Sequence, residues 1–485
     1  MANLFFSKDK VLRSPSLAAS VLPIVFLLVM LAGIIIGGSA DLINTYSPAI
    51  LLSAAALSLL LGRISHSYSA RSLAVGLRRS AVQILPAVPM LLFISMVATT
   101  WMLSGVVPTL IDYGLRVISP TFFLAIACAV CAAVSVLTGS SWSTIATIGV
   151  AFMGIGTVMG YSAPWVAGAI ISGAYFGDKM SPLSDTTVVA SSACGVDLFR
   201  HIRYMMLTSA PAMCVALAVY TAVGLLSGGA GQTSAHEITT ALRSTFNITP
   251  LALIVPAITI TLLALRVPTL WVLAASATTG AAGIYLLQPQ LLPQLWNGPA
   301  ELARVLWSET QFSTGSELLD SLATTSGITG MLPTIALVLS AMTFGAAMLG
   351  TGMIATITRT ITRRLTRRGS IVGTTVASGL FLNSCTADQY LSLIIGGNMY
   401  RNVYRRAGLE PRLLSRTMED SVSVTSVLIP WNSCGVTQSA VLGVATVAYL
   451  PCCIFNLMSP LMSLLMAYTG FKIRSTRASA PAMAH

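Results

Sequence analysis

Gly177-Asp-Lys-Met-Ser-Pro-Leu-Ser-Asp-Thr-Thr187 is a polar stretch that interrupts a long apolar segment. It brings two carboxylates, one ammonium group and a proline into a region that would otherwise be predicted as a membrane helix. A charged side chain at bilayer depth is costly and usually faces a cavity or a partner. Proline breaks a helix, and the backbone groups freed at that depth must be satisfied by protein or trapped water. We therefore predict a broken membrane helix with an ion site at the break.

The composition around this stretch is that of a polytopic membrane protein. Of the 485 residues, 55% are hydrophobic and only 9% are charged, whereas a soluble domain carries about 25% charged residues. In a soluble chain the net charge of +12 would suggest a nucleic-acid partner. Here we attribute it to basic loops that set the membrane topology. We predict no nucleic-acid partner, no metal site at the cysteines and no cofactor.

The distribution of basic residues predicts the topology. The first span, about Ala18–Gly38, lacks a clear signal-peptide cleavage site. We place the N-terminus in the cytoplasm and let the stretches 120–160 and 371–399 enter and leave on one side as hairpins. Only Arg116, Arg243, Arg304 and Lys179 of the 27 lysines and arginines then fall outside the cytoplasmic clusters. This bias supports about ten crossings with both termini in the cytoplasm.

The same topology contains a repeat. Each half consists of three spans, a broken hairpin, a broken span and a last span. The first half begins inside and ends outside, and the second does the reverse, which is the inverted-topology repeat of many secondary transporters. The predicted fold class is an all-α polytopic membrane protein with two hairpins and two broken helices. The predicted units are a first inverted repeat (1–226), an external linker (227–249), a second inverted repeat (250–471) and a cytoplasmic tail (472–485).

Oxygen-bearing side chains gather at the breaks and at the hairpin tips. Na⁺ prefers carboxylate, hydroxyl, amide and freed carbonyl oxygens. The candidate ion or substrate ligands are Asp178, Asp185, Ser181, Thr186, Ser140, Ser141, Asn383, Thr386, Asp388 and Asn432. The three aspartates are the only acids in predicted apolar segments, and we expect them to bind Na⁺. Burial favours the neutral acid until a cation arrives, so Na⁺ and a proton would compete for one carboxylate, which is a minimal antiport mechanism.

Several of these residues also have a structural interpretation. Ser and Thr in membrane helices often only hydrogen-bond their neighbours. Lys179 is either a charge partner in the site or one half of a structural ion pair. Adjacent helix positions do not face each other, so we expect it to pair with Asp388 or Asp185 rather than with Asp178. We expect Glu419-Asp420 to be a water-facing acid pair at a helix start and His201 to lie in a loop.

Six motifs lie in the two halves: Thr138–Ser143, Gly168–Thr187, Asp197–Ile202, Cys385–Tyr390, Leu414–Asp420 and Ile429–Gly435. Together they resemble the NhaC-type sodium/proton antiporter family, within a broader group of inverted-repeat ion carriers. The resemblance implies Na⁺-linked exchange at the inner membrane of a prokaryote, with the matched polar residues lining the site.

The sequence departs from the usual family pattern at three places. The family usually has an Asn-Leu-Ala-Pro-like run where Val188-Val-Ala-Ser191 stands, Gly at Ala387, and Gly-Thr at Val422-Ser423. Losing that Asn removes an oxygen ligand or a substrate contact. Because some proteins resembling this family exchange organic acids or amino acids, these departures bear on the substrate more than on the fold.

The leading hypothesis is a Na⁺/H⁺ antiporter that works by alternating access. The alternative is a Na⁺- or H⁺-coupled exchanger of a small organic acid or amino acid, of the malate/lactate type. An intramembrane protease is a remote alternative, because the closest aspartates share one loop and the four histidines lie in predicted loops or the tail. We expect no enzyme activity. The expected partners are Na⁺, H⁺ and the lipid bilayer. Two further alternatives stay open: transport of a small carboxylate or amino acid, and assembly as a homodimer.

Overall fold

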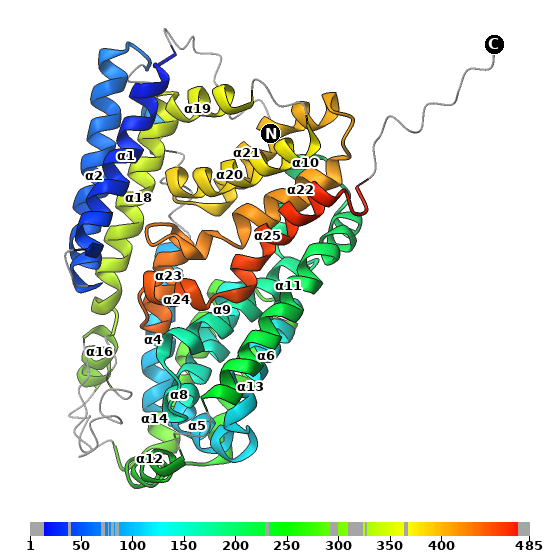
Figure 1. The fold of residues 1–485 in the computed structure, drawn as a ribbon. Coiled ribbons are helices and arrows are strands. Elements are labelled where there is room, and N and C mark those ends of the chain that lie inside the picture. Colours follow the sequence, from blue (N-terminus) through cyan, green and yellow to red (C-terminus); the bar gives the residue numbers. More distant parts are fainter. Residues whose placement is uncertain are drawn as a thin grey trace.

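The computed structural model describes residues 14–36, 40–68, 73–75, 77–78, 82, 87–227, 232–291, 299–308, 324, 327–362 and 367–473. These residues form helices and no strands (Figure 1). Among the described helices, seven are long and apolar enough to cross a membrane, or up to ten if each bent pair counts as one span. The predicted fold class, an all-α polytopic membrane protein, is confirmed. The predicted basic N-terminus and most of the predicted tail lie outside the described residues.

The main helices of the two halves follow one another in chain order. In the first half they are α1 (Leu17–Ile36), α2 (Ala40–Ile64), α4 (Ala87–Leu103), α5 (Val106–Val117), α6 (Phe123–Thr138), α7 (Ser141–Thr144), α8 (Val150–Val158), α9 (Ala163–Met180), α10 (Asp185–Cys194) and α11 (Leu198–Leu226). In the second half they are α13 (Ile254–Ala264), α14 (Thr269–Leu287), α18 (Leu332–Gly350), α19 (Met353–Thr362), α20 (Arg368–Thr386), α21 (Gln389–Arg406), α22 (Pro411–Met418), α23 (Ser433–Leu442), α24 (Thr446–Tyr449) and α25 (Ile454–Thr469). The orientation of the two halves relative to a membrane stays a prediction.

Long helices of one half pack against long helices of the other. Helix α2 of the first half packs along α18 of the second, and α14 of the second packs along α4 of the first. The broken helix α9 lies closest to α6, the first arm of its own hairpin. Gly173 and Gly177 make this approach possible, because a Cβ atom there would lie 2.0 Å from the Cys128 carbonyl oxygen and 2.3 Å from that of Ala132. Small residues four apart are a common means of close helix contact in membranes.

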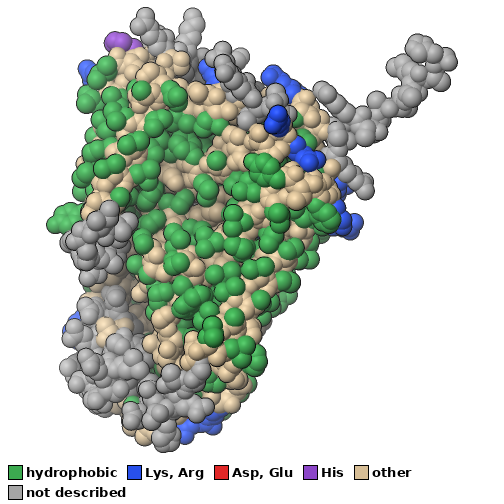
Figure 2. Space-filling model, viewed as in Figure 1, with side chains coloured by type: hydrophobic (Ala, Val, Ile, Leu, Met, Phe, Trp, Pro, Cys, Tyr) green, Lys and Arg blue, Asp and Glu red, His purple; other side chains and the backbone are tan. Residues whose placement is uncertain are grey.

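The surface agrees with a membrane protein. Figure 2 shows hydrophobic side chains over the flank of the molecule and Lys and Arg side chains gathered toward its two ends. This distribution fits a lipid-facing flank between two water-facing ends.

The segment with Asp112 and Arg116 lies between α4 and α6. It forms helix α5, which carries the fully buried Asp112. The Asp112 carboxylate pairs with Arg116 at 2.8 Å and accepts hydrogen bonds from Arg243 at 2.8 and 3.0 Å. Arg243 belongs to α12 (Gln232–Thr245), so an ion pair anchors part of the predicted external linker. A buried acid was therefore missed because two arginines compensate it.

Candidate functional site

The first hairpin tip lies against the break of the first broken helix. Helix α6 ends at Thr138, Gly139 takes the left-handed conformation (φ 70°), and Ser140 caps α7 by accepting a hydrogen bond from the Ser143 amide at 3.2 Å. A Cβ atom on Gly139 would lie 2.7 Å from the carbonyl carbon of Leu183. Leu183 belongs to the non-helical link between α9 and α10, so the glycine allows the tip to touch the break.

One hydrogen bond joins this tip to the acid of the break. The Ser141 Oγ donates to Asp178 Oδ2 at 2.7 Å, and the two residues are only 1% and 8% exposed. Ser141 begins α7, and Asp178 lies in the last turn of α9. Two predicted site residues from separate elements therefore meet. A hydroxyl next to a nearly buried carboxylate is a donor set that suits a small hard cation.

The second hairpin tip lies against the second break in the same way. Helix α20 ends at Thr386, Ala387 takes the left-handed conformation (φ 54°), and Asp388 caps α21 by accepting from the Leu391 amide at 2.7 Å. The Ser433 amide donates to the Ala387 carbonyl at 2.9 Å, and the Asn432 side chain donates to the Asn383 carbonyl at 3.1 Å. The predicted residues of the second tip and the second break are thus in direct contact.

The two tip-and-break units repeat each other residue by residue. Four residues of the first half each have a counterpart in the second half at the same distance along the sequence. They are the threonine of the tip, the N-cap that follows it, the proline of the break and the N-cap after the break. These pairs are Thr138 and Thr386, Ser140 and Asp388, Pro182 and Pro430, and Ser184 and Asn432.

Individual hydrogen bonds repeat at the same separation. Ser135 donates to the Ala174 carbonyl at 2.6 Å, and Asn383 donates to the Val422 carbonyl at 2.7 Å. The two halves therefore share local geometry.

The chemistry at the matching positions differs between the halves. Where the first half places Ser141 against Asp178, the second places Gln389 against Ser426, whose hydroxyl donates to the Gln389 side-chain oxygen at 3.2 Å. The contact of the first half involves an acid, and that of the second is neutral. Val427 stands at the position that matches Lys179.

Lys179 pairs with an unexpected acid. Its ammonium group forms a buried ion pair with Asp420, and the two side chains are 1% and 0% exposed. The predicted pairing with Asp388 or Asp185 is wrong. Asp420 comes from the second half, so the pair joins α9 to the segment that follows α22.

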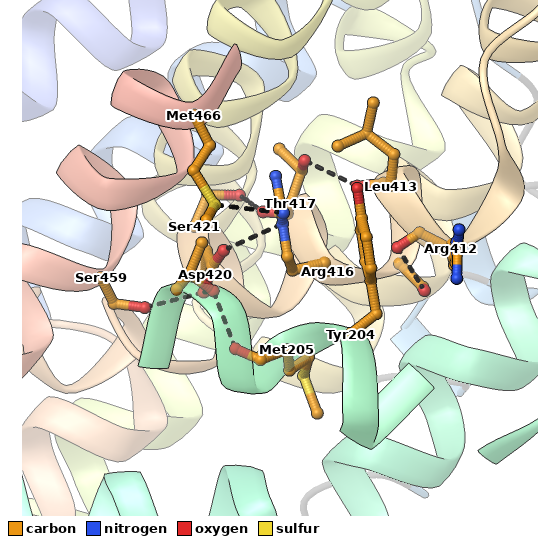
Figure 3. A network of polar contacts seen from close by, with 12 residues as sticks. Tyr204, Met205, Arg412, Leu413, Arg416, Thr417, Asp420, Ser421, Ser459 and Met466 are labelled. Carbon is orange, nitrogen blue, oxygen red and sulfur yellow. Dashed lines mark hydrogen bonds and ion pairs between the residues drawn. The ribbon is translucent and has the colours of Figure 1, made fainter. Parts of the chain in front are cut away.

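Asp420 is held by several further contacts. Its Oδ1 accepts hydrogen bonds from Ser459 at 2.8 Å and from Thr208 at 3.2 Å. The Arg416 guanidinium lies 3.8 Å from Oδ2. Figure 3 shows Arg416, Ser459 and Met205 arranged around Asp420, with the aromatic ring of Tyr204 between Arg412 and Arg416. The distances from the Tyr204 ring centre to these two guanidinium carbons are both 4.7 Å.

Glu419 and Asp420 do not face water, contrary to the prediction. Both are 0% exposed and lie in a π-helical turn, Glu419–Ser423. Within the described part of the chain, neither carboxylate oxygen of Glu419 has a hydrogen-bond partner. π-helical turns inside helices are frequent at functional sites. The second broken segment therefore carries two buried acids. Only the contact at its break, between Gln389 and Ser426, is neutral.

Matching prolines were a sequence signal that could have placed these acids. Pro164 lies in the first turn of α9 and Pro182 follows the end of that helix, and Pro411 and Pro430 bracket the second broken segment in a similar way. The second interval is one residue longer, and the π-helical turn accommodates an extra residue of this kind. Aligning the prolines puts both acids inside a membrane helix.

His201 is also buried, although it was predicted to lie in a loop. It is 0% exposed at the start of α11, and its Nδ1 lies 2.8 Å from the Ser415 hydroxyl. The interpretation of His201 as a loop residue beside two arginines is therefore wrong.

The remaining predicted residues lie around the two breaks with different exposure. Asp185 begins α10 and is exposed. Asp388 is 8% exposed and serves as an N-cap. Ser181, Thr186 and Asn432 are buried.

The three aspartates do not converge on one point. Among the described residues, no group of three or more His, Cys, Asp or Glu side chains is placed to hold a metal ion. In this conformation Asp178 is the acid with a hydroxyl of the facing tip at hydrogen-bond distance. That all three aspartates bind Na⁺ stays a prediction.

Comparison with known proteins finds one matching family model and several curated relatives. The model, described as the Na⁺/H⁺ antiporter family, matches residues 5–197 and 173–471. The Na(+)/H(+) antiporter NhaC of Alkalihalophilus pseudofirmus is 35% identical over 386 residues, which are 79% of this chain and 82% of the relative. The arginine/ornithine antiporter ArcD of Halobacterium salinarum is 33% identical over 466 residues, 95% and 93% of the two chains. The malate-2H(+)/Na(+)-lactate antiporter of Bacillus subtilis is 33% identical over 416 residues, 85% and 87%.

Proposed function

Since this chain belongs to the Na⁺/H⁺ antiporter family, as its motifs predict, we propose that it exchanges Na⁺ for H⁺ across a prokaryotic cell membrane by alternating access. Family membership supports a role as a transporter, and the apolar helices make the chain a multi-pass membrane protein. The cytoplasmic placement of both termini is part of the proposal and rests on the bias of the basic loops.

The contact between Ser141 and Asp178 carries the proposal. A carboxylate with little exposure is stable either as the neutral acid or with a bound cation, because desolvation disfavours its free anion. Na⁺ bound at Asp178 would also be held by the Ser141 oxygen and by backbone carbonyls of the break. A proton arriving at the same carboxylate would release Na⁺, and this competition couples the two fluxes.

The pairing of Lys179 supports a cation site. Lys179 is next to Asp178 in the sequence, but its ammonium group is engaged by Asp420. In the described part of the chain, no Lys or Arg forms a salt bridge with Asp178, Asp185 or Asp388. The region around the break therefore keeps an excess of negative charge, which attracts Na⁺ or H⁺ and repels a free anion.

Reconstituted protein tests the proposal directly. Purified transporter is placed in proteoliposomes that contain a pH-sensitive dye, and an inward Na⁺ gradient is imposed without any organic solute. The proposal predicts that the lumen becomes alkaline, because H⁺ leaves as Na⁺ enters, and that it becomes acidic when the Na⁺ gradient is reversed. Proteoliposomes that show no Na⁺-dependent proton movement under these conditions contradict simple Na⁺/H⁺ exchange.

A second candidate is the Na⁺- or H⁺-coupled exchange of a small organic acid or amino acid. The names of two relatives, an arginine/ornithine and a malate/lactate antiporter, support it. The unneutralised acids at the break favour a cationic amino acid over a free carboxylate, which would need a bound cation first. Adding arginine, ornithine, lactate or malate to the same proteoliposomes separates the candidates, because proton movement that requires one of them identifies the solute exchanger.

A further inference from the structure

A basic pocket lies at the end of the molecule where α11, α22 and α25 meet. Its volume is about 860 Å³. Arg200 and Arg203 on α11, Arg412 on α22 and Lys472 after α25 bring four positive charges to its wall. The acids of the wall are Asp197 and Glu410. None of its lining residues belongs to either break.

Three of the four cations are available to a ligand. Asp197 is occupied as the N-cap of α11, where it accepts from the Arg200 amide at 3.0 Å, and Glu410 pairs with Arg412. In the part of the chain that the structure describes, no carboxylate pairs with Arg200, Arg203 or Lys472. The pocket is therefore suited to an anion that carries one or two negative charges.

An apolar groove continues from this pocket along the flank of the molecule. It has a volume of about 490 Å³ and runs between α11 and α25, lined by Pro211, Met462, Leu465 and Phe471 among others. Leu207 belongs to the wall of both cavities, so the groove begins where the basic pocket ends. Both helices belong to the apolar part of the chain, and Leu465 is 57% exposed in the groove.

We propose that the basic pocket and the apolar groove together form a binding site for one anionic phospholipid. The phosphate of the headgroup would contact Arg200, Arg203 and Lys472, and an acyl chain would lie in the groove between α11 and α25. Basic pockets between membrane helices are suited to anionic headgroups, and each nearby Lys or Arg contributes about 1 kcal/mol. The adjoining groove favours a lipid over a soluble phosphate, because it adds apolar surface that a free anion cannot cover.

Two residues of the proposed lipid site contact Arg416, which lies beside the buried ion pair of Lys179 and Asp420. Tyr204 lines the pocket, and its ring lies between the guanidinium groups of Arg412 and Arg416. Met466 lines the groove and accepts a hydrogen bond from Arg416 at 3.4 Å. Arg416 lies beside Asp420, the partner of Lys179. A lipid in this site would therefore contact the residues that surround the link between the two halves.

Native mass spectrometry of the purified full chain tests the proposal. Delipidated protein in detergent is titrated with phosphatidylglycerol, with phosphatidylcholine of the same acyl chains, and with soluble glycerol phosphate. We expect phosphatidylglycerol to be retained with preference, and the substitutions Arg200→Gln, Arg203→Gln and Lys472→Gln to weaken this preference about fivefold for each charge removed. Glycerol phosphate that binds as tightly as phosphatidylglycerol would assign the pocket to a soluble anion and overturn the proposal.

Two matched controls keep general effects apart from the site. One control variant combines Arg359→Gln, Arg405→Gln and Arg406→Gln and so removes three exposed cations outside the pocket. If it loses as much lipid preference as the variant that combines the three pocket substitutions, the site is not specific. Leu465→Trp fills the groove, whereas Leu461→Trp enlarges a comparably exposed residue of α25 that does not line it. We expect only Leu465→Trp to weaken lipid retention, and unchanged retention in that variant would refute the acyl-chain part of the site.

Discussion

Lys179 and Asp420 form a buried ion pair that connects the broken helix of the first half to the broken segment of the second. Removing one partner of a buried pair leaves an uncompensated charge, which costs about 3–5 kcal/mol. We expect Lys179→Met to lower the free energy of unfolding by that amount, less any contribution that Arg416 recovers. Lys179→Met with Asp420→Asn should regain most of it. Thermal unfolding of the purified variants measures both effects, and a double variant as unstable as Lys179→Met would contradict the pairing.

Ser141→Ala should weaken Na⁺ coupling without unfolding the protein. The substitution removes the 2.7 Å hydrogen bond to Asp178, and a hydrogen bond to a charged group is worth about 1.5–3 kcal/mol. The apparent affinity for Na⁺ should therefore fall roughly 10- to 100-fold in Na⁺-driven proton transport. Ser209→Ala is the matched control, because Ser209 is equally buried and its hydroxyl has no hydrogen-bond partner among the described residues. Equal apparent affinities for Na⁺ in the two variants would show that Ser141 is not part of the ion site.

Asp178→Asn and Asp185→Asn should each abolish coupled transport. The amide keeps the size and the hydrogen-bonding oxygen of the acid but can neither take up a proton at working pH nor neutralise Na⁺. The measurement is Na⁺-driven proton movement in proteoliposomes, with helix content by circular dichroism as the folding control. The proposed mechanism fails if both variants transport at near the normal rate.

Asp388→Asn is expected to act on affinity alone. Asparagine caps a helix as well as aspartate does, so α21 should keep its start and the protein its stability. If Asp388 contributes negative charge to the ion site, the apparent affinity for Na⁺ should fall while the maximal rate changes little. An unchanged affinity would leave Asp388 with a capping role only.

Gly139→Ala should damage transport more than its backbone strain explains. A Cβ atom there would collide with the Leu183 backbone at 2.7 Å and push the hairpin tip away from the break. Gly443→Ala is the control for strain alone, because Gly443 has a similar φ of 66° and no atom lies within 4 Å of its added Cβ. A left-handed alanine costs about 1–2 kcal/mol at either site. Similar Na⁺-driven rates in both variants would argue against a functional contact between tip and break.

Local signals made the breaks predictable. Pro182 and Pro430 end helical stretches through covalent chemistry alone, and polar N-caps such as Ser184 and Asn432 mark where the next helix begins. The tips at Gly139 and Asp388 follow from the same kind of evidence. Residues within a few positions of one another decide these features, so the sequence contains enough information to locate them.

Long-range partners were not predictable from the same evidence. Lys179 and Asp420 are far apart in the chain, and no local pattern favours that pair over one with Asp388. Glu419 and Asp420 follow a basic loop, where acids usually face water, and no local pattern places them in the protein interior; only a comparison of the prolines in the two halves does so. Asp112 and His201 were misjudged for the same reason, because their burial depends on arginines and serines from distant segments.

The two tips combine the same backbone geometry with different chemistry. The tip and break have matching hydrogen bonds in both halves, in which Ser135 and Asn383 donate to matching carbonyls. The side chains that meet there differ: an acid with a hydroxyl in the first half and an amide with a hydroxyl in the second. Two substitutions, Gln389→Ser and Ser426→Asp, would give the second half the same pair of side chains as Ser141 and Asp178 in the first. The scaffold thus separates the shape of an ion site from its charge, because the same backbone geometry carries an acid in one half and a neutral amide in the other.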